Sequence, residues 1–226
     1  MAGWARLSLV GCARLGRHGR KRERHPIMAL RFTMRTASYF LFANRKYRMI
    51  AKSQDVVIAL ALVALNRDHH ERLQYARLAE MLMMSSSEAH KATRRLIAAG
   101  LVEPGGWRPL QEPLFNYLIH GVPHAFPGKL GEPTRGVPTA WGAPFLARSL
   151  PQGSDLPPVW PWHEGRVRGN AVEPLYRSVP EAVNRLPSLY EPLALVDALR
   201  IGRARDREIA RGLLKELLLN DSSLAH

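Results

Sequence analysis

The hydrophobic pattern becomes helical at Ser53. A run of valine, isoleucine, leucine and alanine between Val56 and Leu65 predicts a mostly buried first helix. Ser53 is a suitable N-cap for it, and Asp55 places an acid in the first turn, where the helix dipole favours a negative charge. Apolar residues then recur at three- and four-residue spacing over residues 75–103, which predicts two further helices joined by a short turn.

The second of these two helices has chemically different faces. Ser85 or Ser86 caps its start, and Gly100 ends it as the residue after the C-cap. One side carries small and apolar residues: Ala89, Ala92, Thr93, Leu96 and Ile97. The other side carries hydroxyl groups, an imidazole and cations: Ser87, His90, Lys91, Arg94 and Arg95. A helix that enters the major groove of DNA needs this division between a packing face and a polar face.

The string LAEMLMMSSSEAHKATRRLIAAGLVE resembles the helix-turn-helix of winged-helix regulators similar to the MarR group. The resemblance covers the LAE opening, the turn, the serine-rich helix start, the R-R-L spacing and the AAGLV ending. It implies a winged helix-turn-helix DNA-binding domain over residues 51–120. Residue by residue, it implies contacts to base edges or adjacent phosphates from five side chains: Ser86, Ser87, His90, Lys91 and Arg94. Arg95 would instead hold the DNA backbone.

Two parts of the segment depart from that pattern. The turn position that is usually glycine is Met83, where a left-handed conformation costs a side chain about 1 kcal/mol, unless the turn is built differently. Residues 101–103 can form a strand of the wing and residues 105–106 a turn. Pro104 and Pro109, however, leave little room for a hairpin.

Residues 121–178 are rich in proline and glycine, which disfavours long helices and central strands. Disorder fits equally poorly, because the segment contains many large apolar groups: Phe126, Trp141, Phe145, Val159, Trp160 and Trp162. We therefore expect an ordered, irregular loop region that wraps the domain or forms a docking surface. Arg135 and Arg168 are each followed by glycine, which suggests an anion or partner contact. A packed loop with two exposed arginines is the alternative.

Residues 179–219 return to a helical pattern. Pro180 and Pro187 each begin a helix, and Gly202 separates the second from a last helix with an apolar stripe. The arginines before that last helix, among them Arg203 and Arg205, contact a phosphate or an acidic partner, or else form a solvated face. The expected fold class is thus mainly α: a winged helix-turn-helix domain, a proline-rich irregular segment and C-terminal helices.

The net charge of +14 is unevenly distributed along the 226 residues. Residues 1–50 hold 12 Lys or Arg and one acid, Glu23, which gives +11, so the rest of the chain carries only +3. This basic arm is either disordered and bound to DNA phosphates, an organellar transit peptide, or upstream of a true start at Met49. DNA binding by the remaining residues therefore has to be argued from the motif.

The sequence contains no constellation typical of an enzyme. It lacks a nucleophile with an adjacent base and a zinc-ligand motif, and its single cysteine, Cys12, forms no thiolate cluster. We therefore expect a non-enzyme with no catalytic residues, no cofactor and no metal. No apolar run approaches the roughly 20 residues of a membrane span, and the cysteine content fits a reducing cytoplasm.

The stretches LPPVWP, RGNAVEPLY and LVDALRIGRARDRE extend the resemblance to an uncharacterised bacterial subgroup of MarR-like regulators with the same proline-rich C-terminal half. The resemblance implies a sequence-specific transcriptional regulator, an autorepressor that binds double-stranded DNA as a homodimer. A nucleotidyltransferase-type protein is a partner it also implies. The alternative is an antitoxin-like or adaptor protein whose helix-turn-helix and proline-rich half bind a protein partner.

Overall fold

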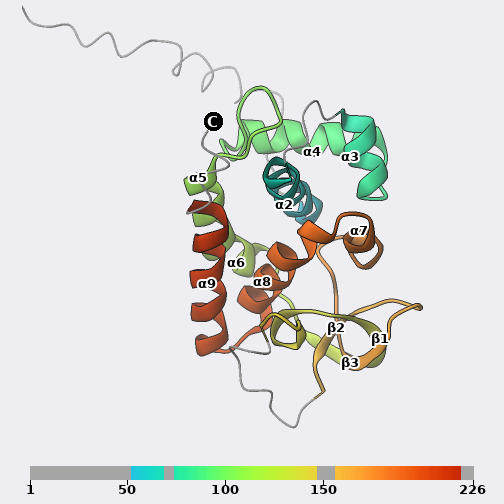
Figure 1. The fold of residues 1–226 in the computed structure, drawn as a ribbon. Coiled ribbons are helices and arrows are strands. Elements are labelled where there is room, and N and C mark those ends of the chain that lie inside the picture. The colour runs from blue at the N-terminus through green and yellow to red at the C-terminus, as the bar shows by residue number, and fades with distance from the viewer. Residues whose placement is uncertain (1–51, 69–73, 147–155, 220–226) are drawn as a thin grey trace, which may run out of the picture. The chain divides into compact units, whose positions relative to one another are not determined.

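The first half of the fold is organised around helix α2 (Ser53–Arg67), in which every residue from Asp55 to Leu65 is buried. Figure 1 shows the computed structural model, which describes residues 52–68, 74–146 and 156–219. Helices α3 (Tyr75–Met81) and α4 (Ser86–Ala98) pack together, and α4 also packs on α2. The predicted helices over this segment are confirmed. The basic arm of residues 1–50, with Cys12, lies outside the described residues.

The start of α2 differs by one residue from the prediction. Lys52 occupies the N-cap position and Ser53 is the first helical residue. The backbone N–H of Lys52 donates to the Asp55 carboxylate at 3.1 Å, so the acid of the first turn acts as the capping group. A serine hydroxyl is therefore not needed at this helix start.

A second helical segment follows without interruption through residues 111–125. It consists of α5 (Gln111–Asn116), a π-helical turn (Tyr117–Gly121) and α6 (Val122–Ala125). The wide π turn carries the helix past Gly121. Pro123 then falls in the first turn of α6, where a missing N–H is tolerated.

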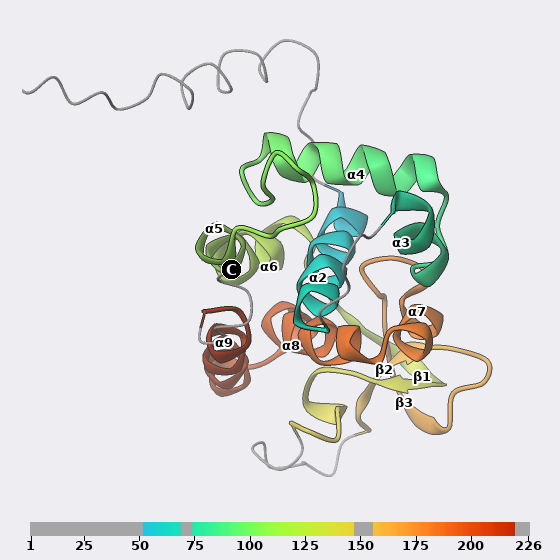
Figure 2. The same ribbon diagram turned by 45° about the horizontal axis from the view of Figure 1, so that its top comes forward.

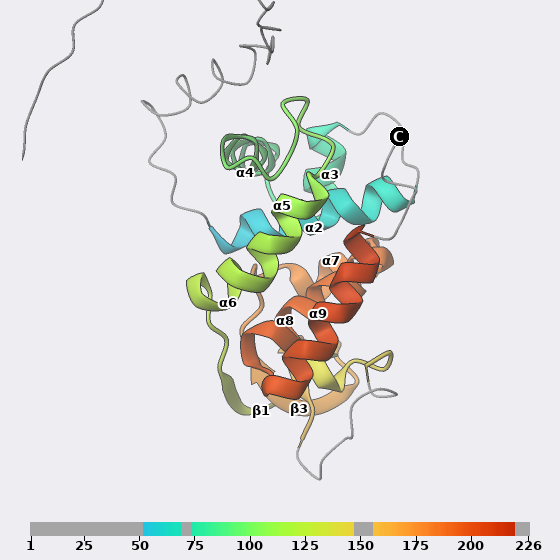
Figure 3. The ribbon, with the colours of Figure 1, turned by 90° about the vertical axis from the view of Figure 1, so that its left-hand side faces the viewer.

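The C-terminal helices are α7 (Val179–Arg185), α8 (Tyr190–Ile201) and α9 (Ala204–Leu219), as the helical pattern of residues 179–219 predicts. Helix α8 is buried from Pro192 to Arg200, because α2, α6 and α9 all pack against it. Figure 3 shows α9 running alongside α8. Within the described ranges, no helix is long and apolar enough to cross a membrane.

The proline-rich segment contains a small three-stranded barrel, so its prediction as an irregular loop is corrected. Strand β1 (Leu130–Pro138) pairs antiparallel with β2 (Pro158–Pro161) and with β3 (Val167–Val172), while β2 and β3 pair in parallel. The prolines lie at strand ends or, for Pro133, at a shift in register, which are the places where a strand tolerates them. The barrel can close because Gly136 approaches the Trp160 carbonyl so closely that a Cβ would collide with it.

A buried carboxylate joins this barrel to α8. Asp197 is 1% exposed and accepts three side-chain hydrogen bonds. The indole N–H of Trp160 in β2 donates at 2.5 Å, and the Thr139 hydroxyl donates at 3.0 Å. Arg200, one turn further along α8, donates at 2.5 Å and forms an ion pair. The carboxylate is therefore fully paired, as a buried charge must be.

Arg200 and Tyr190 extend the same junction. The Arg200 guanidinium also donates to the carbonyl oxygens of Phe126 at 2.8 Å and of Glu173 at 3.2 Å. The Tyr190 hydroxyl donates to the Pro138 carbonyl at 2.8 Å, and burial raises the pKa of Tyr190 to about 12, which keeps this donor protonated. The helix α8 thus fixes both chain segments that enter and leave the barrel.

We predict that Asp197→Ala lowers the free energy of unfolding by about 3–5 kcal/mol, because it leaves Arg200 buried without a counter-charge. Urea denaturation followed by circular dichroism measures the change. Glu216→Ala, at an exposed acid of α9, is the control and should stay within about 0.5 kcal/mol of the parent. Equal urea midpoints for the two variants would contradict the role assigned to Asp197.

Candidate nucleic-acid interface

Helix α4 separates a packing face from an exposed polar face. Ala89, Ala92, Thr93 and Leu96 are buried, and the Thr93 hydroxyl donates to the Ala89 carbonyl at 3.0 Å, so it is satisfied in the core. Figure 2 shows α4 lying across α2 and α3. Five of the predicted contact residues are exposed together along its outward side: Ser86, Ser87, His90, Lys91 and Arg94.

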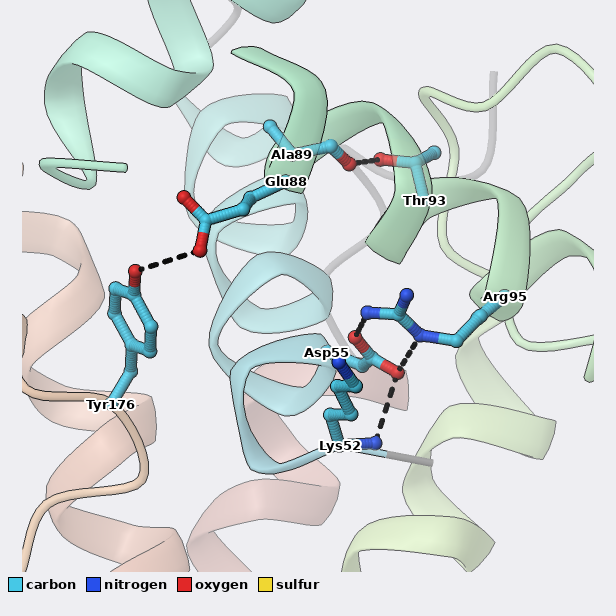
Figure 4. A network of polar contacts seen from close by, with 7 residues as sticks. All are labelled: Lys52, Asp55, Glu88, Ala89, Thr93, Arg95 and Tyr176. Atoms are coloured by element: carbon cyan, nitrogen blue, oxygen red, sulfur yellow. Dashed lines mark hydrogen bonds and ion pairs between the residues drawn. The ribbon is translucent and has the colours of Figure 1, made fainter. Parts of the chain in front are cut away.

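The start of α4 is fixed by the predicted cap. Ser85 accepts from the backbone N–H of Glu88 at 3.2 Å, and the Glu88 carboxylate accepts from the Ser85 backbone N–H at 3.0 Å. The carboxylate also accepts from the Ser85 hydroxyl at 2.8 Å, and the two bonds that it accepts from the Ser85 N–H and hydroxyl hold the pKa of Glu88 below its usual range. The carboxylate turns toward the hydroxyl of Tyr176, which donates at 3.5 Å (Figure 4). The negative charge of the first turn therefore points toward Tyr176.

The turn between α3 and α4 adopts the left-handed one of the two alternatives that the sequence leaves open. Met83 has φ 54° and is exposed, so it occupies the usual glycine position with a side chain. The turn is also held from the C-terminal half of the chain. The Ser178 hydroxyl donates to the Leu82 carbonyl at 2.5 Å, next to the Tyr176–Glu88 contact.

Residues 101–110 form a short hairpin beside α4. Val102 and Pro109 form a single bridge, and the backbone N–H of Glu103 donates to the Arg108 carbonyl at 2.8 Å. The side-chain amide of Asn66 in α2 donates to the Trp107 carbonyl at 2.8 Å and fixes the hairpin. The hairpin is as short as its two prolines predict.

An aromatic row ties that hairpin to α3 and α4. The ring centroids of Trp107 and Tyr75 are 4.6 Å apart, and the Tyr75 ring meets the His90 ring edge-on with their centroids 5.1 Å apart. These contacts set the distance between the hairpin and the outward face of α4. The exposed Arg108 lies on this hairpin and is a cation that the sequence analysis missed. Its position directly after the Gly-Gly turn and Trp107 could have identified it as an exposed cation of the hairpin.

Arg95 does not share the exposed face. Its Nε donates to the Asp55 carboxylate at 2.8 Å and its Nη2 binds the other carboxylate oxygen (Figure 4). The side chains of Arg95 and Asp55 are only 17% and 4% exposed, and the pairing raises the pKa of Arg95. The structure therefore gives Arg95 the role of fastening α4 to α2, in place of the predicted contact with the DNA backbone.

The four arginines that the sequence offers as anion or partner contacts outside α4 lie in two separate places. Arg135 in β1 and Arg168 in β3 lie directly opposite each other in the barrel and line one cavity. Arg203 and Arg205 are exposed at the start of α9 and do not line that cavity. The backbone N–H of Arg203 donates to the Asp206 carboxylate at 2.9 Å, which explains how this arginine-rich helix start is capped.

Comparisons of the chain with protein-family models, with curated proteins and with solved structures gave no match. The resemblance to MarR-like regulators and the partner it implies stay predictions. Support for a function therefore comes from the geometry of α4 and its hairpin.

We predict that Arg95→Ala lowers the free energy of unfolding by about 3 kcal/mol, because Asp55 is then buried without its partner. Lys91→Ala, at an exposed position of the same helix, should change it by no more than about 0.5 kcal/mol. A double-mutant cycle with Asp55→Ala measures the coupling, expected at about 2 kcal/mol. Additive effects of the two substitutions would contradict the pairing.

We also predict that Met83→Gly stabilises the fold by about 0.5 kcal/mol. Glycine relieves the left-handed strain of about 1 kcal/mol, and part of that gain is lost through the greater freedom of the unfolded chain. Lys91→Gly is the control, since Lys91 is exposed and is not among the residues with positive φ, and it should be destabilising by about 1 kcal/mol. Thermal denaturation of both variants tests the difference in sign; two shifts in the same direction would contradict the strain argument.

Proposed function

We propose that this chain is a sequence-specific DNA-binding transcriptional regulator, an autorepressor, in which residues 51–120 act as a winged helix-turn-helix domain. The observation that carries the proposal is the outward face of α4. It presents two serines, a histidine and two cations in one row, while the opposite face is packed on α2 and α3. Major-groove recognition requires a rigidly held helix with such a row.

The order of the side chains along α4 supports a division of labour. Ser86, Ser87 and His90 lie in the first turns, where short hydrogen-bonding groups reach base edges. Lys91 and Arg94 follow, with the length to reach guanine or a phosphate. One good bidentate contact between arginine and guanine contributes about 1–3 kcal/mol of discrimination.

The hairpin supplies a second point of contact in this proposal. Arg108 is exposed on it, and the row of Trp107, Tyr75 and His90 links the hairpin to α4. A phosphate held by Arg108 would set the orientation of the domain on the duplex without reading sequence. One domain covers a half-site, so the proposal includes binding as a homodimer to a two-fold symmetric site.

The proposal predicts that Lys91→Ala/Arg94→Ala lowers the affinity for the preferred duplex on the order of 100-fold, because two cationic contacts are lost. The full chain is first used to select duplexes from a random pool. DNA from upstream of its own gene is tested beside the selected duplexes. Mobility shifts with scrambled duplex as competitor, at two salt concentrations, then measure the affinity.

Arg207→Ala/Lys215→Ala is the matched control, since it removes two exposed cations from another helix, α9. It should keep the preference for the selected duplex. The basic arm is present in both variants, so its sequence-independent attraction cancels in the comparison. If no sequence is enriched, or if both double variants bind alike, α4 does not read DNA. The antitoxin-like or adaptor function with a protein partner is then the better description.

A further inference from the structure

The small barrel carries a cavity of about 770 Å³ that is open to solvent, and the arginines that line it are exposed. It lies between β1, β3 and the turn that joins β2 to β3. Figures 1 and 3 both place these strands at the end of the fold opposite to α4. The cavity is therefore separate from the proposed DNA-binding face.

Three arginines dominate the cavity. Arg135 stands directly opposite Arg168 in the antiparallel pairing of β1 and β3, and Arg166 lies two residues before Arg168 on the approach to β3. Like charges directly opposite each other destabilise a sheet. Among residues 52–68, 74–146 and 156–219, these three guanidinium groups have no hydrogen bond or ion pair. The sheet thus carries an uncompensated positive cluster.

The remaining lining residues leave that cluster positive. Glu164 is the acidic residue of the lining, and its carboxylate lies 3.6 Å from Nε2 of His163. Three cations against one carboxylate leave a net charge of +2 before any proton on His163 is counted. An anion is the ligand that such a cavity favours.

The glycines beside these arginines serve the barrel itself. A Cβ on Gly136, Gly165 or Gly169 would collide with backbone of a neighbouring strand or turn. Each of the three arginines adjoins one of these glycines in sequence. The backbone that carries the three arginines is therefore held in place by close packing.

An aromatic side chain extends the cavity. An adjoining hollow of about 570 Å³ shares Arg135 and His163 with it and is lined by Trp162, which is half-buried. Cations that can hold phosphate thus lie next to an indole that can stack on a flat ring. We propose that this cavity binds a nucleotide, with its phosphates on Arg135, Arg166 and Arg168 and its base against Trp162.

Calorimetric titration of the full chain with ATP, AMP and inorganic tripolyphosphate tests the proposal. Arg135→Gln/Arg168→Gln should weaken ATP binding about 100-fold, since two charge-assisted contacts are lost. Arg203→Gln/Arg205→Gln removes the same charge from two equally exposed arginines outside the cavity and should change ATP binding less than about twofold. Equal losses in both variants, or no binding of ATP by the parent chain, would overturn the proposal.

Trp162→Leu separates a nucleotide from a simple polyphosphate. It should weaken ATP and AMP binding about tenfold or more and leave tripolyphosphate binding unchanged. Unchanged ATP binding in this variant would show a phosphate site and overturn the assignment to nucleotides. Thermal denaturation of the unliganded Arg135→Gln/Arg168→Gln variant completes the test. Its midpoint should equal or exceed that of the parent, because the substitution relieves repulsion between like charges.

Discussion

The fold depends on one buried ion pair, between Asp197 and Arg200 of α8. Each partner alone would be an uncompensated charge in the core, so the pair is stable only with its further hydrogen bonds in place. Asp197 accepts a hydrogen bond from Trp160 of β2, and Arg200 donates hydrogen bonds to the carbonyls of Phe126 and Glu173. The segments before and after the barrel are therefore fixed by the same helix that packs against α2.

Residues 173–178, which follow β3, connect the Asp197–Arg200 ion pair to α4. Glu173 is held by Arg200, and a few residues later Tyr176 and Ser178 contact Glu88 and the carbonyl of Leu82. The turn before α4 is thus supported by the C-terminal half of the chain. The ion pair of Arg95 with Asp55 holds the C-terminal end of α4 on α2. In the proposed regulator, these contacts present α4 as a rigid element for DNA.

The sequence predicted the features that depend on neighbouring residues, and it missed those that depend on distant ones. A serine cap at Ser85 or Ser86 and a helix end at Gly100 follow from local backbone chemistry, and the structure has the cap at Ser85 and a positive φ at Gly100. Of the two alternatives for the turn at Met83, the structure has the left-handed one. The pairing of Arg95 with Asp55 joins residues 40 apart and has no local signal. The barrel was missed for the same reason, since its glycines permit close approaches that appear only once distant strands meet.

The central claim is that α4 and its hairpin form the surface that contacts DNA. Hydrogen–deuterium exchange of the full chain, with and without a duplex selected by the protein, tests it most directly. The account predicts slower exchange on binding in residues 86–98 and 101–110, with no change in β1, β2 and β3. Protection confined to the barrel or to the basic arm, with α4 unchanged, would contradict it.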